Sequence, residues 1–245
     1  MKAFWNAFCM CYGMFTTLPC PYRPWDEDAR DMMLVCLPIV GALLGLIWAA
    51  LGGLAMAWLP TSLRAALIAA TPWLLTGFIH LDGYMDTCDA ILSWRPLEQR
   101  LRILKDVHTG ALAVVGMGLL VMFSYAACEA LDWAGLRALL FIPAISRCGS
   151  AFCVLTLKPL GHSEYAKTEG KGAQRLAVIA MWLIAVIACN LWLRKLAIAL
   201  LVETAAYGLA MFWAHRTLKG VSGDVAGFAL TIGELAALIA LACIH

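Results

Sequence analysis

Long apolar runs alternate with short polar stretches along the whole chain, and they predict helices that cross a membrane. A transmembrane helix needs about 20 predominantly apolar residues, and about seven runs reach or approach that length. They cover residues 34–58, 63–79, 109–128, 137–157, 176–193, 196–213 and 225–244. The pattern predicts an all-α fold, a polytopic integral membrane bundle of about seven transmembrane helices.

Composition excludes a water-soluble domain. Of the 245 residues, 63% are hydrophobic and 14% are charged, and the mean hydropathy is +0.82. Soluble domains are about half apolar and a quarter charged. The predicted spans leave only short connections, so residues 1–245 are expected to form a single integral membrane domain. The net charge of +2 is too small to indicate nucleic acid as a partner.

The distribution of Lys and Arg predicts the orientation. Segments 1–33, 80–108, 158–175 and 214–224 hold 13 of these residues, the opposite connections hold 4, and Arg147 lies within a span. By the positive-inside rule, the N-terminus is cytoplasmic. Segment 1–33 is interpreted as an interfacial helical segment. Because the polar loops lie on the same side, any active site is expected at the cytoplasmic membrane surface.

The most informative stretch is HLDGYMDTCD, residues 80–89. On a helix, Asp82, Asp86 and Asp89 lie at about 0°, 40° and −20°, so they share one face. Like charges on one face repel each other unless a cation binds between them. Carboxylate oxygens suit Mg²⁺ or Mn²⁺. The alternative is a solvated acidic helix end.

Asp106 lies farther along the same predicted cytoplasmic segment, 80–108, just before the third span. As a fourth carboxylate at this surface, it is expected to complete a site for one or two metal ions. Two bridged metals stabilise the attacking and leaving oxygens of a phosphoryl displacement. The alternative is an ordinary loop residue.

Three further features place charge within or beside the membrane. Arg147 lies inside an apolar span, where an ionisable group indicates function; it is predicted to bind phosphate in bidentate fashion, or alternatively to pair with Glu203 or Glu234. Lys167 and Lys171 lie in a Gly-containing loop that suits a polyanion, although a solvated surface loop explains them equally well.

The last span opens with GVSGDVAG, residues 220–227, and contains Glu234. Gly223 and Gly227 are four residues apart, which is typical of close helix packing. Packing explains the glycines but not the acidic residues. The residues alone leave the role of Asp224 and Glu234 open; the family resemblance described below implies that they bind a metal or the nucleotide.

Taken together, these motifs resemble the cobalamin synthase family, the adenosylcobinamide-GDP ribazoletransferases. The resemblance covers nearly the whole chain in the family's order, and the HLDG-x-x-DTCD signature is its most specific part. The matching elements are TLPCP at 17–21, LPIVG at 37–41, HLDGYMDTCD at 80–89, KDVHTG at 105–110, Ser146-Arg147, residues 165–172, and GDVAG at 223–227 with Glu234.

The resemblance implies one reaction. The ribose 3′-hydroxyl of α-ribazole, or of its 5′-phosphate, attacks adenosylcobinamide-GDP and displaces GMP. The product is adenosylcobalamin or its 5′-phosphate. Corrinoid nucleotide, α-ribazole and membrane lipid are the implied partners, and the implied location is the cytoplasmic (inner) membrane of a bacterium or archaeon. Association with a second copy, or with other enzymes of cobalamin synthesis, is left open.

Roles follow for the residues that match the family's motifs. Asp82, Asp86, Asp89 and Asp106 are expected to hold Mg²⁺, or Mn²⁺, while Asp82, Asp86 or His80 accepts the hydroxyl proton. His80 lies about 200° from Asp82 on a helix, so a structural role is its alternative. The expected substrate contacts are Arg147, Lys167, Lys171, Asp224 and Glu234.

The sequence departs from the family's pattern in three places. His108 stands where an Arg is expected, a glycine-rich tail after Gly110 is missing, and the chain enters the next span early after Gly172. None of these departures removes a carboxylate.

Two other functions compete with this interpretation. A CDP-alcohol phosphotransferase would carry Ala-Arg after D-G-x-x, but here Met85 is followed by Asp86-Thr87. An ion-coupled transporter could use Glu203, Arg147 and Glu234 as a relay, but the chain has no evident internal repeat.

Overall fold

The computed structural model describes residues 2–160 and 171–244, and the regular elements in this part of the chain are helices. The all-α prediction is therefore confirmed. The long helices are α2 (Met33–Trp58), α3 (Thr61–Leu75), α6 (Ala111–Glu129), α8 (Ile142–Thr156), α9 (Gly172–Leu193), α10 (Ala197–Leu218) and α11 (Gly223–Cys243).

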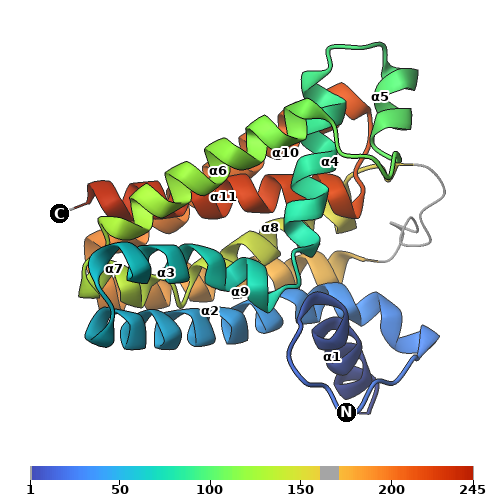
Figure 1. The fold of residues 1–245 in the computed structure, drawn as a ribbon. Coiled ribbons are helices and arrows are strands. Elements are labelled where there is room, and N and C mark those ends of the chain that lie inside the picture. Colours follow the sequence, from blue (N-terminus) through green and yellow to red (C-terminus); the bar gives the residue numbers. More distant parts are fainter. Residues whose placement is uncertain (1, 161–170, 245) are drawn as a thin grey trace.

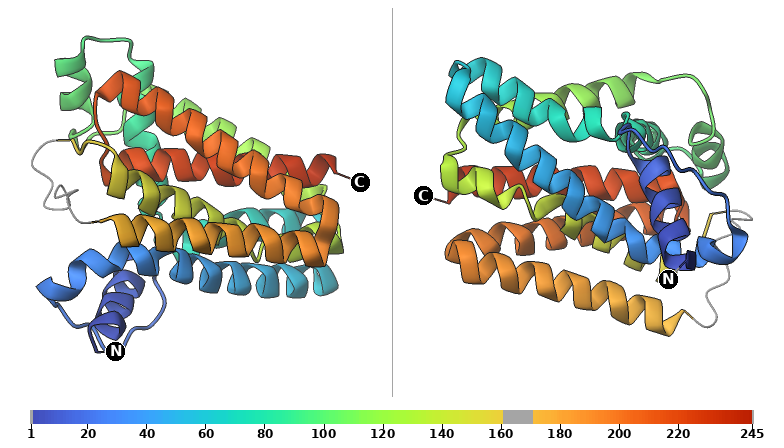
Figure 2. Two further views of the ribbon diagram at one scale, coloured as in Figure 1. Left: turned by 180° about the vertical axis from the view of Figure 1, so that it is seen from behind. Right: turned by 90° about the horizontal axis from the view of Figure 1, so that it is seen from below.

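The long helices lie along one axis, and two helices cross that axis near one end (Figures 1 and 2). The crossing helices are α1 (Lys2–Phe15) and α4 (Ile79–Leu92), and the short α5 (Leu97–Ile103) lies beside α4. We call this the α4 end: the end of the bundle that holds α1, α4, α5 and the start of α11. The C-terminus lies at the opposite end. The remaining short elements are η1 (Glu27–Met32), α7 (Trp133–Ala138) and η3 (Arg194–Leu196).

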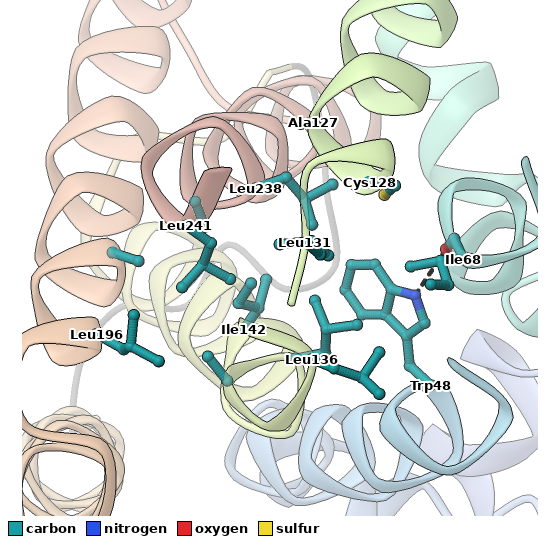
Figure 3. Close-up of a cluster of buried hydrophobic side chains, with 14 of the residues drawn as sticks. Trp48, Ile68, Ala127, Cys128, Leu131, Leu136, Ile142, Leu196, Leu238 and Leu241 are labelled. Atoms are coloured by element: carbon teal, nitrogen blue, oxygen red, sulfur yellow. Dashed lines mark hydrogen bonds between the residues drawn. The ribbon is translucent and has the colours of Figure 1, made fainter. Parts of the chain in front are cut away.

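A cluster of apolar side chains joins the helices away from the α4 end (Figure 3). At its centre is Trp48 of α2, which is fully buried and packs in the same cluster as Leu136 of α7 and Leu238 of α11. Its indole N–H donates to the Ile68 carbonyl of α3 at 2.7 Å. A buried indole needs such a partner, so this bond fixes α2 against α3.

Within the described residues, five segments are long and apolar enough to cross a membrane, or six if the bent pair α3 and α4 forms one span. The longest, Gly172–Leu218, contains both α9 and α10. The five are Met33–Trp58, Ala111–Glu129, Trp133–Thr156, Gly172–Leu218 and Gly223–Cys243. A membrane bundle is thus supported, whereas the count of seven spans is not confirmed and the orientation stays a prediction.

The predicted span 63–79 ends early, because the chain turns sharply after Leu75. Helices α3 and α4 differ in direction by 91°. Gly77 and Phe78 both have left-handed backbones, with φ of 61° and 64°, and a left-handed residue is a common way to end a helix. Beyond the turn, the Asp-rich stretch does not extend away from the bundle as a free segment. It forms α4, which packs against α11 and α6.

Candidate active site

Helices α4 and α11 cross closely at two glycines, and the contact leaves no room for a side chain at Gly83. A Cβ on Gly83 would lie 2.6 Å from the Asp224 Cα, and a Cβ on Gly227 would lie 3.3 Å from the His80 carbonyl oxygen. The Thr231 hydroxyl also donates to that carbonyl, at 3.4 Å. The predicted role in helix packing is therefore confirmed for Gly227, but it is wrong for Gly223, where nothing lies within 4 Å of a Cβ. The backbones of the HLDG and GDVAG motifs touch each other.

This crossing brings carboxylates from the two motifs together. Asp86 is half-buried and lies within electrostatic range of Asp82, Asp224 and Asp89, each of which repels it. Asp82 is exposed, and Asp224 is half-buried. The predicted acidic face of α4 thus gains a carboxylate from α11, more than 130 residues away in the chain.

Helix α11 begins with a serine cap that also orients Asp224. The Ser222 hydroxyl oxygen accepts from the backbone N–H of Val225 at 3.3 Å and donates to Asp224 Oδ2 at 3.2 Å. A serine at this position satisfies one of the free N–H groups that open a helix. The carboxylate of Asp224 is thereby tied to the helix start.

Asp89 has a structural task at the other end of α4. Its two carboxylate oxygens accept from the backbone N–H groups of Gly110 at 2.6 Å and Ala113 at 2.9 Å, at the start of α6. A Cβ on Gly110 would lie 2.6 Å from the carboxylate. Asp89 is buried and caps a helix that is remote in sequence. Its predicted metal contact stays a prediction.

Asp106 lies with Asp89 rather than with Asp82. Both line a hollow of about 300 Å³ between α4, the end of α5 and the start of α6. Asp106 accepts from the His108 backbone N–H at 3.0 Å and contacts His108 Nδ1 at 2.7 Å. These bonds lower the pKa of Asp106, the side-chain bond contributing most. His108, which stands where the family's pattern has Arg, therefore contacts the Asp106 carboxylate that is predicted to bind metal.

Within the described part of the chain, no three His, Cys, Asp or Glu side chains are close enough together to hold a metal ion. The donor chemistry at the α4 end still suits magnesium, because Asp82, Asp86 and Asp224 offer carboxylate oxygen atoms, and Asp86 is repelled by each of the other two. Magnesium is commonly held by one or two carboxylates together with water and substrate phosphates. A protein cage of three ligands is not needed for such an ion.

Arg147 and Glu234 pair with each other inside the bundle. Their side chains are 1% and 9% exposed, and Arg147 donates to Glu234 Oε1 at 2.7 Å. Ser146 donates to the same oxygen at 2.9 Å, and the guanidinium also donates to the Pro143 carbonyl. This is the structural pairing considered for Arg147 in place of phosphate binding. Arg147 thus forms the ion pair with Glu234 that was the alternative to phosphate binding. The contacts of both residues with substrate stay predictions.

Glu203 of α10 is fully buried near this pair. Both of its carboxylate oxygens lack a hydrogen-bond partner. Its charged neighbours are Glu234, which repels it, and Arg147, which attracts it. An isolated carboxylate is very costly to bury in its ionised form. Arg147 is already paired with Glu234, so Glu203 does not share that ion pair.

Two other predicted site residues have surroundings that the sequence did not reveal. The His80 ring stacks on Phe15 of α1 with centroids 6.2 Å apart, and its buried Nε2 has no hydrogen-bond partner. Lys171 is 5% exposed at the start of α9. Lys167 lies outside the described residues.

Sequence reasoning missed three residues that shape this site. Gly83 permits the crossing of α4 and α11, Ser222 orients Asp224, and Phe15 covers the His80 ring. The glycine was visible within the HLDG motif, and Ser222 lies three residues before the predicted last span, 225–244. Nothing near Phe15 in the sequence connects it with residue 80.

Comparison with known proteins matches the model of one family, cobalamin-5-phosphate synthase, over residues 7–242. A protein named adenosylcobinamide-GDP ribazoletransferase from Clostridium botulinum (strain Alaska E43 / Type E3) is 37% identical over 252 residues, covering 100% of this chain and 99% of its own. A protein with the same name from Clostridium perfringens (strain SM101 / Type A) is 35% identical, and the alignment covers 100% of both chains. Another from Geotalea daltonii is 30% identical, and that alignment covers 93% of this chain and 92% of the relative. No solved structure matches the chain.

Proposed function

The chain belongs to the cobalamin-5-phosphate synthase family, and we propose that it is an adenosylcobinamide-GDP ribazoletransferase embedded in the cytoplasmic membrane. It joins adenosylcobinamide-GDP to α-ribazole, or to α-ribazole 5′-phosphate, and releases GMP. The apolar helices support the membrane location. The excess of Lys and Arg on one side supports an active site that faces the cytoplasm.

The observation that carries this proposal is the crossing of α4 and α11. It brings Asp86 of one motif within electrostatic range of Asp224 of the other, at the α4 end, and Asp82 is within range of the same Asp86. Phosphoryl transfer depends mainly on positioning and on cations that offset the charge of the reacting phosphates. A group of mutually repelling carboxylates at a membrane surface is suited to hold such a cation.

The reaction balances as a single displacement. The 3′-oxygen of the ribose forms a bond to the corrinoid-side phosphorus, and the bond from that phosphorus to the bridging oxygen of the pyrophosphate breaks. GMP leaves with the bridging oxygen, and the hydroxyl proton passes to a base. We assign the proton to Asp82 or Asp86, with His80 as the other candidate.

Magnesium, or manganese in its place, would supply positive charge to the pyrophosphate when it is bound. Asp82 and Asp86 would hold it, and Asp224, which lies within electrostatic range of Asp86, would add a third oxygen or orient the nucleotide. Asp89 acts here mainly through its bonds to the start of α6, which fix the far end of α4. Asp106 remains a candidate ligand from the neighbouring hollow.

The predicted phosphate contacts have unequal support. Lys171 lies at the start of α9, and Lys167 precedes it by four residues in the sequence. We propose that these two lysines contact the pyrophosphate. Arg147 and Glu234 are proposed to act on the substrates only through the packing of α8 against α11, because their own contact is buried.

The experiment is GMP release by the full chain in nanodiscs, from adenosylcobinamide-GDP and α-ribazole 5′-phosphate, with Mg²⁺ or with EDTA. Asp82→Asn and Asp86→Asn are compared with Asp28→Asn, which changes an exposed carboxylate outside the crossing. We expect release with Mg²⁺ that is lost with EDTA, and a loss of at least about 100-fold in the first two variants only.

Each outcome bears on a different part of the proposal. A folded wild-type protein that releases no GMP would contradict the transfer reaction itself. GMP release that is equal with EDTA and Mg²⁺, or equal in Asp82→Asn, Asp86→Asn and wild type, would keep the reaction but contradict the carboxylate–metal site.

A further inference from the structure

The connection between α4 and α5 holds outward a tryptophan that has no role in the candidate site. Trp94 is 81% exposed, whereas tryptophan is highly buried on average. It directly follows Ser93, the C-cap of α4, and its backbone is left-handed with φ of 54°. Glycine is the usual residue at this position of a helix end, because a bulky side chain is strained in this conformation. The chain therefore places an exposed indole where glycine would fold more easily.

Basic side chains surround this tryptophan in the sequence. We call residues 93–105 the α4–α5 lip. Its charged residues are four cations and one acid: Arg95, Arg100, Arg102, Lys105 and Glu98. Glu98 pairs with Arg102 at 2.6 Å, and both side chains are more than three-quarters exposed, so water screens this pair. Helix α5 also packs against α10, whose C-terminal end adds the exposed Arg216 and Lys219. The lip thus carries an excess of positive charge.

The lip projects sideways from the bundle, beyond α6 (Figures 1 and 2). Helix α4 differs in direction from α3 by 91°, so with the long helices crossing the bilayer, α4 runs along the bilayer surface. The outer face of α6 exposes Val114, Leu119 and Met122, and the apolar surface of a membrane-spanning helix contacts lipid. The lip therefore overhangs the lipid headgroups beside α6.

Tryptophan and arginine together match the chemistry of a lipid surface. The indole ring prefers the boundary between hydrocarbon and water, where its apolar body is buried and its N–H stays hydrated. Arginine binds phosphate oxygens in bidentate fashion, and each added Lys or Arg strengthens the attraction to an anionic bilayer. Helix α5 has no fully buried residue, so it lies on the surface of the protein, where its cations can meet headgroups.

We infer that the α4–α5 lip binds anionic phospholipid headgroups, with the Trp94 ring inserted among them and Arg95 and Arg102 on their phosphates. A second copy of the chain, or another protein, would have to displace these headgroups to reach the ring. The contact also anchors to the bilayer the C-terminal end of α4, the helix that carries Asp82 and Asp86. This inference goes beyond the proposed function and does not depend on the transfer reaction.

Photo-crosslinking tests the contact in the full chain, in nanodiscs with equal amounts of phosphatidylglycerol and phosphatidylcholine. The probe p-benzoylphenylalanine replaces Trp94, and the mass of the intact product identifies the attached lipid or protein. Leu97, also exposed on the lip, is a second position for the probe. Trp58 is the matched control, because it is 82% exposed at the end of α2 and residues 55–63 carry no charge. The probe there should attach to both lipids equally.

At Trp94 we expect lipid adducts in which phosphatidylglycerol exceeds phosphatidylcholine by at least about threefold. The excess should shrink in about 0.5 M salt, which screens the charges. Arg95→Gln combined with Arg102→Gln should lower the ratio of the two lipids at least about twofold, while lipid adducts remain. Arg137→Gln combined with Arg194→Gln removes two exposed cations of α7 and η3, at the opposite end of the bundle, and should leave the ratio unchanged.

Three results would overturn the inference. Products with the mass of two chains and no lipid would make the lip an interface between copies. A lack of adducts at both Trp94 and Leu97, while Trp58 gives them, would place the lip in water. Equal amounts of the two lipids at Trp94, or a ratio that neutralising Arg95 and Arg102 does not lower, would show that the cations do not select anionic lipid. GMP release enters none of these measurements, so their failure is distinct from failure of the proposed function.

Discussion

Replacing Gly83 by Ala tests whether the contact between α4 and α11 builds the site. The new Cβ would lie 2.6 Å from the Asp224 Cα and 3.0 Å from its carbonyl oxygen. Ordinary contacts of a Cβ begin at 3.4 Å, so the two backbones must separate by about 0.8 Å. Both atoms that Gly83 would meet belong to backbone, and no side-chain rotation can relieve the contact.

The magnitude follows from two opposing effects. Overpacking of this kind costs about 1–3 kcal/mol, whereas Ala is favoured over Gly within a helix by about 1 kcal/mol. Gly118→Ala on α6 provides the control, because nothing lies within 4 Å of a Cβ there. It should stabilise by about 1 kcal/mol. The free energies of unfolding of the two variants should thus differ by about 1–3 kcal/mol.

Activity should respond more strongly than stability. Separation of the helices moves Asp86 away from Asp224 by about the same 0.8 Å, and a misplacement of about 1 Å can lower a rate by about 100-fold. Thermal unfolding in one detergent and GMP release in nanodiscs measure the two effects. We expect Gly83→Ala to lose about 100-fold in GMP release and Gly118→Ala to keep the wild-type rate.

Two results would refute this reasoning in different ways. Equal unfolding midpoints for Gly83→Ala and Gly118→Ala would show that the helices do not touch at Gly83. A lowered midpoint for Gly83→Ala with a wild-type rate would keep the contact, but would show that the spacing of the carboxylates does not limit the reaction.

Two further predictions concern charges elsewhere. Glu234→Gln leaves Arg147 buried without its anion and should lower the free energy of unfolding by about 3–5 kcal/mol. Glu203→Gln removes no ion pair and should change the free energy of unfolding by less than about 1 kcal/mol. Denaturation in mixed micelles measures both values. His108→Ala should raise the pKa of Asp106 toward its usual value. In the wild-type protein the pKa of this carboxylate is lowered, so any stability that it adds is present at pH values above the pKa of an ordinary Asp. That stability is lost as the pH falls through the lowered pKa. Titration of the Asp106 carboxyl carbon by ¹³C NMR measures the change in pKa.

Most helices could be predicted because burial in a bilayer demands long apolar runs. The run 34–58 corresponds to α2 at Met33–Trp58, and the run 225–244 corresponds to α11 at Gly223–Cys243. The bend after Leu75 could not be predicted in this way. Apolar residues continue through 79, and composition does not distinguish a straight helix from one that turns at Gly77.

The site could be predicted only as far as local geometry reaches. Helical spacing placed Asp82, Asp86 and Asp89 on one face of α4. It could not show that Asp89 bonds to the start of α6, because its partner Gly110 is 21 residues away. Arg147 and Glu234 are 87 residues apart, and their pairing likewise depends on how α8 packs against α11.

These long-range contacts explain why α4 can act as a rigid platform although it lies beyond a sharp turn. Gly83 holds it against α11, and Asp89 holds it against α6 six residues later. Between them, the Tyr84 hydroxyl donates to the Gly116 carbonyl of α6 at 3.1 Å. Asp86 lies between these anchor points, so its position is fixed before any substrate or metal binds. A site that is preorganised by neighbouring packing loses less free energy when it orders its ligands, and the residues that achieve this here need not touch the substrate.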